Sequence, residues 1–183
     1  MTPKQSYNAF LAQKVIKEFK SRNIQGFYYD TKEEALKKVF EIIPEGSVVS
    51  WGGSLTLNEI GLIDSLKKGK YNILDPNAAT GGIEKDKIAH QALNSDYYLM
   101  SANAISASGE LVNIDGIGNR VAALIFGPKS APLTVLSYKK SEVVSFEELL
   151  KKAEGNVSQL VITTMSTFKD RTKVILIGES LGF

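Results

Sequence analysis

The pattern of apolar and polar positions switches between two periods along the chain. Short runs of β-forming residues, at residues 26–29, 48–50, 71–74 and 96–100, alternate with stretches whose apolar residues recur every three or four positions. In the first such stretch, residues 6–22, Leu11, Val15 and Phe19 fall on one face of a predicted helix. Strands separated by helices predict right-handed crossovers and a mainly parallel sheet, and therefore an α/β fold.

The same signals continue to the end of the chain. A Thr31…Glu34 capping box begins a second helix that Pro44 ends. Ser108 and Gly109 form a hairpin turn. The remaining segments predict helices at residues 84–94, 120–126 and 146–154, and strands at residues 104–106, 110–114, 131–137, 161–164 and 173–177.

Residues 48–61 are the stretch around which the prediction is organised. They are interpreted as a strand end, a glycine turn of Gly52, Gly53 and Ser54, and a helix opened by a Thr56…Glu59 capping box. That helix continues to Gly69, with apolar residues on one face at Leu57, Ile60, Ile63 and Leu66. Free N–H groups at a helix N-terminus suit an anionic group, although a tight connection is an equally valid interpretation. The turn matches neither a Walker loop nor GxGxxG, so no nucleotide is predicted.

A second polar run lies between residues 101 and 120. Asp115 to Asn119 form a loop with two glycines, and Asn119 is placed to cap the helix at residues 120–126. The polar residues of the whole run 101–120 are candidate ligand-binding residues: Asn103, Asn113, Asp115, Asn119 and Arg120. The glycine turn, Gly52, Gly53 and Ser54, is a candidate as well. Arginine is well shaped for a carboxylate or a phosphate, whereas the alternative is that these residues serve turns and a surface ion pair. We predict that the two runs meet at the carboxyl edge of the sheet, with Arg120 pointing into the site or bracing Asp115.

Composition narrows the chemistry. The 183 residues, 43% of them hydrophobic, predict one domain spanning residues 1–183. Twenty-two basic residues against 20 acidic ones leave a net charge of +2, which argues against nucleic-acid or membrane-surface partners. No signal peptide or membrane span is evident, so we expect a cytoplasmic protein. With no cysteine and one histidine, His90, we expect no metal site, no iron–sulfur cluster and no cofactor.

Three separated runs carry a family resemblance. Residues 51–61, residues 101–122 and the ending at residues 173–183 resemble the LUD-domain family, which includes lactate-utilisation proteins of the LutC/YkgG type. The resemblance implies the NagB/RpiA/CoA-transferase-like fold, an α/β sheet with a small hairpin near the site. It also implies a link to the oxidation of lactate to pyruvate alongside iron–sulfur partner proteins. Many relatives carry a cysteine-rich stretch before the final strand, and residues 156–171 here contain none.

Two functions of different class follow from this resemblance. The first is a non-redox accessory or small-molecule-binding subunit of lactate utilisation, which the missing cysteines favour. The alternative is an enzyme acting on a phosphorylated sugar or an acyl-CoA, by analogy with the wider superfamily. In that enzyme the glycine turn would hold the anion, and Glu59 or Asp115 would act as general base or nucleophile. Three kinds of partner are possible: a small anionic ligand, iron–sulfur lactate-utilisation proteins, and a second copy of the chain.

Overall fold

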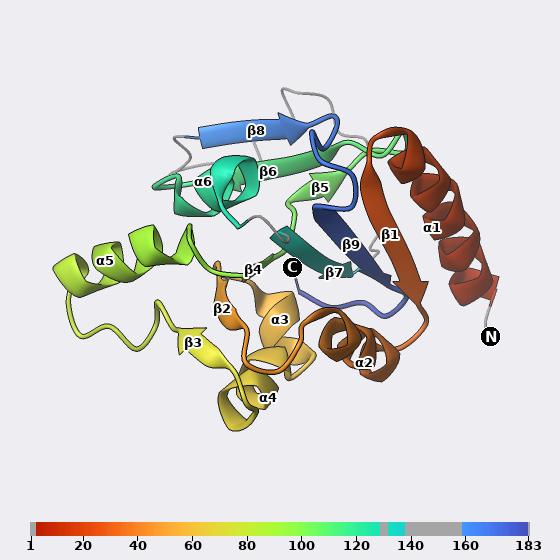
Figure 1. Cartoon of the computed structure of the whole chain (residues 1–183). Coiled ribbons are helices and arrows are strands. Elements are labelled where there is room, and N and C mark those ends of the chain that lie inside the picture. Colours follow the sequence, from red (N-terminus) through yellow and green to blue (C-terminus); the bar gives the residue numbers. More distant parts are fainter. Residues whose placement is uncertain (1–2, 129–131, 138–158, 183) are drawn as a thin grey trace.

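A parallel sheet forms the centre of the fold in the computed structural model, which describes residues 3–128, 132–137 and 159–182 (Figure 1). The helix predicted at residues 146–154 lies outside these residues. All neighbouring strands of the six-stranded sheet run parallel. Their order is β1 (Ile24–Tyr29), β9 (Thr172–Ile177), β7 (Pro132–Ser137), β4 (Tyr97–Met100), β2 (Val48–Trp51) and β3 (Asn72–Leu74). The predicted α/β fold with a mainly parallel sheet is confirmed.

A second, antiparallel sheet of three strands follows β4 in the chain. It consists of β5 (Ala104–Ile105), β6 (Leu111–Asp115) and β8 (Gln159–Thr163). The hairpin between β5 and β6 turns at Gly109, whose φ of +89° a glycine adopts without strain. The predicted small hairpin is therefore present.

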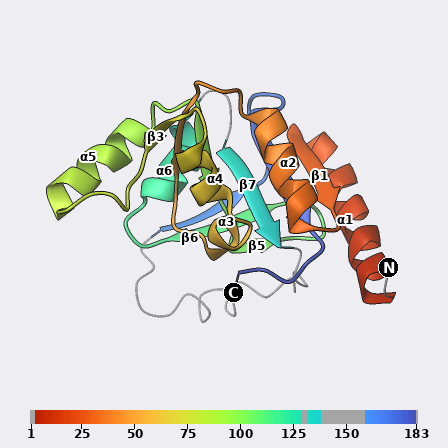
Figure 2. The same cartoon turned by 90° about the horizontal axis from the view of Figure 1, so that it is seen from below.

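Helices cover both faces of the parallel sheet. Apolar contacts place α2 (Lys32–Ile42), α3 (Leu55–Glu59) and α4 (Leu62–Lys68) on one face, and Figure 2 shows β7 in view between α2 on one side and α3 and α4 on the other. The other face is covered by α1 (Pro3–Ser21), the small sheet, α5 (Gly82–Ala92) and α6 (Asn119–Phe126). Helices on both faces explain why several strands are apolar almost throughout, as in the run from Val174 to Ile177, which is fully buried.

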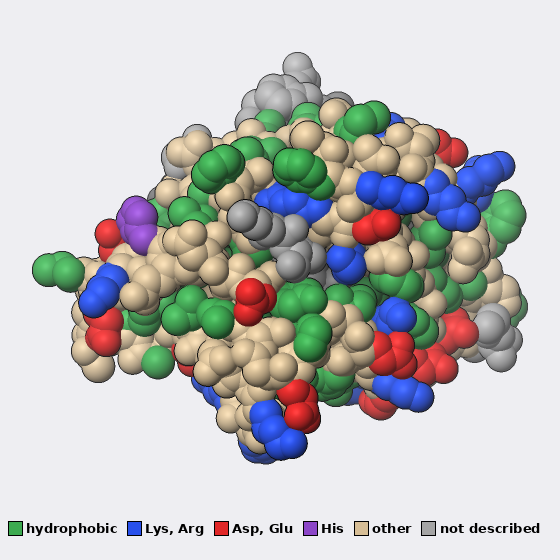
Figure 3. All heavy atoms as spheres, in the orientation of Figure 1, with side chains coloured by type: hydrophobic (Ala, Val, Ile, Leu, Met, Phe, Trp, Pro, Cys, Tyr) green, Lys and Arg blue, Asp and Glu red, His purple; other side chains and the backbone are tan. Residues whose placement is uncertain are grey.

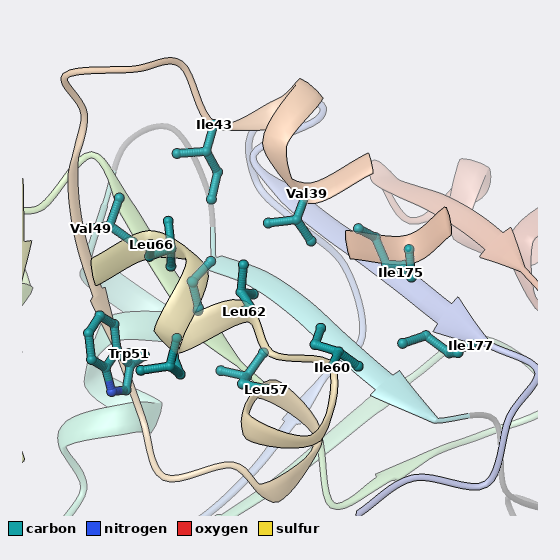
Figure 4. Close-up of a cluster of buried hydrophobic side chains, with 13 residues drawn as sticks. Val39, Ile43, Val49, Trp51, Leu57, Ile60, Leu62, Leu66, Ile175 and Ile177 are labelled. Carbon is teal, nitrogen blue, oxygen red and sulfur yellow. The ribbon is translucent and has the colours of Figure 1, made fainter. Parts of the chain in front are cut away.

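The largest cluster of buried side chains lies under α2, α3 and α4. Figure 4 shows Val39 and Ile43, at the C-terminal part of α2, facing Leu62 and Leu66 of α4 over the strands. The predicted helical face of Leu57, Ile60, Ile63 and Leu66 is buried as a set. Burying a side chain of this size contributes about 1.5–3 kcal/mol to the free energy of unfolding, so these residues fix the path of the chain after β2.

The single helix predicted from Thr56 to Gly69 is wrong in one respect. The chain breaks at Gly61, whose φ of +71° lies in the left-handed region, and forms α3 and α4 in its place. The break lets both short helices turn their apolar side onto the sheet. Two predicted signals hold: the Thr31…Glu34 capping box is present, and Gly69 caps α4 at its C-terminus.

Charged side chains are spread over the surface. In Figure 3, Lys and Arg atoms are interspersed with Asp and Glu atoms on the face shown, in keeping with the net charge of +2. No helix among residues 3–128, 132–137 and 159–182 is long and apolar enough to cross a membrane.

Candidate functional site

The site lies where the connections of two neighbouring strands leave the sheet in opposite directions. β2 continues through α3 and α4 to β3 at one edge, whereas β4 continues through β5, β6 and α6 to β7 on its other side. The carboxyl ends of β2 and β4 are adjacent, because Trp51 pairs with Leu99 and the Gly52 N–H donates to the Leu99 carbonyl at 3.0 Å. Open α/β sheets place their ligands at such a switch point.

The glycine turn at the end of β2 is held by its own serine. Ser54 Oγ accepts a hydrogen bond from the Leu57 N–H at 3.3 Å and is the N-cap of α3. The predicted Thr56…Glu59 capping box is therefore wrong. Glu59 Oε2 accepts instead from the Gly182 N–H at 2.8 Å, a contact across 123 positions of the chain. Because α3 has only five residues, its dipole is too small to support the predicted anion site by itself.

Arg120 ties three segments of the second polar run together. Its Nη1 donates to the Ser101 carbonyl at 3.0 Å, and its Nη2 donates to Asn103 Oδ1 at 2.9 Å and to the Ile114 carbonyl. Asn103 Oδ1 also accepts from the Ile114 N–H at 2.9 Å. The guanidinium thus joins the end of β4 to β6, and partial burial lowers the pKa of Arg120.

Asp115 acts on α6 through the backbone. Its Oδ2 accepts from the N–H groups of Arg120 at 2.8 Å and Val121 at 3.1 Å. It therefore does the work predicted for Asn119, which is already inside the helix; the N-cap position is Gly118, at φ +87°. A side chain can reach the free N–H groups of a helix's first turn only if its residue precedes that turn, and Asp115 does so whereas Asn119 does not. The Arg120 guanidinium makes no hydrogen bond to the Asp115 carboxylate, so of the two predicted placements the bracing one is not found.

The two polar runs meet at Gly52. A Cβ atom built on Gly52 would lie 3.1 Å from Arg120 Cδ and 3.2 Å from the Tyr98 hydroxyl. A Cβ at this position would force Arg120 or the Tyr98 hydroxyl to give way by a few tenths of an ångström, so glycine allows the close contact. Gly53 differs, since it is exposed and nothing lies within 4 Å of the corresponding position. The stem of Arg120 and the glycine turn therefore form one surface, as predicted for their proximity.

Tyr98 is a site residue that the sequence did not single out. It lies in β4, its side chain is 2% exposed, and it packs with Met100 and Leu124. Burial, with a smaller contribution from Asp115, raises the pKa of Tyr98 to about 12. Its hydroxyl has no hydrogen-bond partner among the described residues, and it remains protonated at neutral pH. The sequence gives only an aromatic residue in a strand, a pattern that core packing explains equally well.

Asn113, another predicted binding residue, is enclosed in the small sheet and makes no hydrogen bond to the glycine turn among the described contacts. Asn113 shares the inward face of β6 with Leu111 and is 1% exposed. Its Oδ1 and the indole nitrogen of Trp51 are enclosed and have no partner within the described part of the chain. In Figure 4 that nitrogen lies on the side of the ring away from Val49. Within the residues the structure describes, no group of three or more His, Asp or Glu side chains could hold a metal ion.

Comparison with known proteins identifies a family. The LUD-domain family model matches residues 12–176. Among solved structures, the chain is similar to a crystal structure of a DUF162 family protein from Deinococcus radiodurans, with a TM-score of 0.57 and 14% identity over 94% of this chain and 98% of that one. At that identity the likeness shows the fold alone. No curated protein matches the chain.

Proposed function

We infer a role in lactate utilisation for this chain, which belongs to the LUD-domain family. The proposed role is that of a non-redox accessory or small-molecule-binding subunit, acting beside partner proteins that carry the iron–sulfur clusters. The family link to lactate oxidation supports this role. The sequence contains no cysteine, so this chain lacks the thiolates that would hold an iron–sulfur cluster, and the partner proteins would carry it.

The observation that carries the proposal is the convergence of the glycine turn and Arg120 at the switch point. Arg120 Cδ would lie 3.1 Å from a Cβ on Gly52, although the two residues are far apart in the chain. The backbone N–H groups of Gly53 and Ser54 have no partner among the described residues, and Gly53 faces open space. A cationic side chain beside free donors at a carboxyl edge is suited to a small anionic ligand.

The alternative, an enzyme acting on a phosphorylated sugar or an acyl-CoA, gains no specific support from these contacts. Both candidate carboxylates already hold backbone N–H groups: Glu59 binds Gly182, and Asp115 binds Arg120 and Val121. These hydrogen bonds give Glu59 and Asp115 a structural role that accounts for both carboxylates without catalysis. The accessory role is therefore the better supported of the two.

Deletion of the gene in the source organism tests the role. We expect the deletion strain to grow normally on glucose and slowly or not at all on lactate as sole carbon source, with growth restored by the wild-type gene. Normal growth of the deletion strain on lactate would contradict the proposed role, whatever the protein binds.

A further inference from the structure

The Tyr98 hydroxyl is a hydrogen-bond donor beside the glycine turn that no described residue uses. The Tyr98 side chain is 2% exposed, yet its hydroxyl has no partner among the described residues. That hydroxyl lies 3.2 Å from the position of a Cβ on Gly52, and so beside the glycine turn. The hydroxyl is not among the enclosed side-chain atoms without a partner, which are Trp51 Nε1 and Asn113 Oδ1, so it keeps access to a ligand while the ring is buried.

Within the described part of the chain, the turn offers several donors without a partner, although the Gly52 and Gly53 carbonyls also accept no hydrogen bond there. The Gly53 and Ser54 N–H groups have no partner among the described residues, and Arg120 uses Nη1 once and Nη2 twice, which leaves its Nε–H without an acceptor. Ser54 Oγ, the obvious acceptor, is occupied by the Leu57 N–H. Because burial raises the pKa of Tyr98 to about 12, its hydroxyl also stays protonated and able to donate. Such a set binds an acceptor-rich group and not a cation.

The charge at the turn matches a single negative charge. Arg120 has no carboxylate within ion-pair distance among the described side chains, and Asp115 directs one oxygen to backbone N–H groups. The Asp115 charge still acts on the pKa of both Arg120 and Tyr98, so the turn has no surplus positive charge for a polyanion. The described contacts of Gly52 bring one cation to the turn, Arg120. A phosphate dianion or the several phosphates of a coenzyme A ester would call for further basic groups. A carboxylate carries one negative charge and accepts several hydrogen bonds, and so it fits the single cation, Arg120, and the neutral donors beside it.

We propose that the glycine turn, Tyr98 and the Nε–H of Arg120 bind the carboxylate of a small monocarboxylic acid, with the Tyr98 hydroxyl as a direct donor to it. This inference rests on the proposed function in one respect, since it names the ligand class of that same site. It adds a binding residue, Tyr98, and it excludes sugar phosphates and coenzyme A esters as the favoured ligands.

Thermal-shift and calorimetric titrations with lactate, pyruvate, acetate and inorganic phosphate test the proposal on the full chain. The test variant is Tyr98→Phe, which keeps the packed ring and removes the hydroxyl. The matched control is Tyr97→Phe, the neighbouring tyrosine of β4, which packs with the cluster on the opposite face of the sheet. The free Tyr98→Phe protein is expected to melt close to the wild-type temperature, because the ring stays packed and the hydroxyl has no hydrogen-bond partner among the described residues to lose.

We expect wild type and Tyr97→Phe to bind at least one of the three acids with equal affinity and more tightly than phosphate. We expect Tyr98→Phe to bind that acid about tenfold more weakly, the loss of one hydrogen bond to a charged group. Equal binding by Tyr98→Phe, preference for phosphate, or no binding of any acid would each overturn the proposal. Those outcomes leave the growth test untouched, so a lactate-specific growth defect without carboxylate binding would remove this inference and keep the proposed function.

Discussion

Arg120 lies across the backbone of Gly52, with its Cδ 3.1 Å and its Cγ 3.3 Å from where a Cβ on that glycine would be. This packing contact joins the end of β2 to the start of α6, and among the described residues no hydrogen bond links these two segments. Arg120 is held in place by bonds to the Ser101 carbonyl and to Asn103. These bonds resist the shift of a few tenths of an ångström that a Cβ on Gly52 would demand.

Alanine at the two adjacent glycines should have opposite consequences. Gly52→Ala places a Cβ against Arg120 and the Tyr98 hydroxyl, so we expect a loss of about 1–2 kcal/mol in the free energy of unfolding. Gly53→Ala meets open space and should change that free energy by no more than about 0.5 kcal/mol. Urea unfolding of both variants measures the difference. Equal stability of the two would show that Arg120 does not press on Gly52.

Capping of α6 should depend on Asp115 and not on Asn119. Asp115→Ala removes the acceptor for the Arg120 and Val121 N–H groups and should cost about 1–2 kcal/mol. Asn119→Ala should cost less than about 0.5 kcal/mol, since no side-chain cap bond comes from that position. Thermal and urea unfolding compare the two variants; a larger loss for Asn119→Ala would contradict this assignment.

Acid should weaken the attachment of α1 to the hairpin. Glu110 accepts from the Ser106 and Ser108 hydroxyls and pairs with Arg22, and these contacts lower the pKa of Glu110 below its ordinary value of 4.5. A lowered pKa in the folded state gives stability that is complete above pH 4.5 and is lost as the pH falls through the folded-state pKa.

Glu110→Gln provides the test of this pH dependence. The stability gap between wild type and Glu110→Gln should be widest near neutral pH and should narrow below about pH 4.5. Urea unfolding at several pH values measures it. A gap that stays constant from neutral pH to about pH 3 would mean that the carboxylate contributes through packing and not through its charge.

The isolated protein should have no redox activity of its own. With no cysteine, one histidine and no dinucleotide fingerprint, we expect purified protein to show no cluster or flavin absorbance band and no lactate-dependent dye reduction. A visible absorbance band, or dye reduction that follows the protein through purification, would contradict the accessory role.

Local patterns predicted the elements well because each is determined by its own residues. The strands at β2 and β9 follow from apolar β-forming runs, and the Thr31…Glu34 capping box follows from two residues three apart. The sequence pattern places the caps of α3 and α6 at the wrong residues because a cap depends on the residue at which the helix begins. Apolar periodicity locates a helix but does not fix its first residue.

Long-range contacts explain what the sequence could not show. Glu59 fits a local capping box by spacing, but its carboxylate reaches Gly182 at the other end of the chain. Tyr98 fits a core strand, and only the position of its hydroxyl beside Gly52 marks it as a site residue. By contrast, the meeting of the glycine turn with Arg120 was predictable, because parallel strands bring their carboxyl ends to one edge.

Amide NMR tests most directly whether the glycine turn, Tyr98 and Arg120 form one binding site. In a titration of labelled protein with lactate or pyruvate at constant ionic strength, the Gly53 and Ser54 amides and the Arg120 Nε–H should shift along one saturable curve. Amides of the exposed side of α5 should not move. Saturable shifts located elsewhere, or only linear and unsaturable shifts at the turn, would contradict the claim.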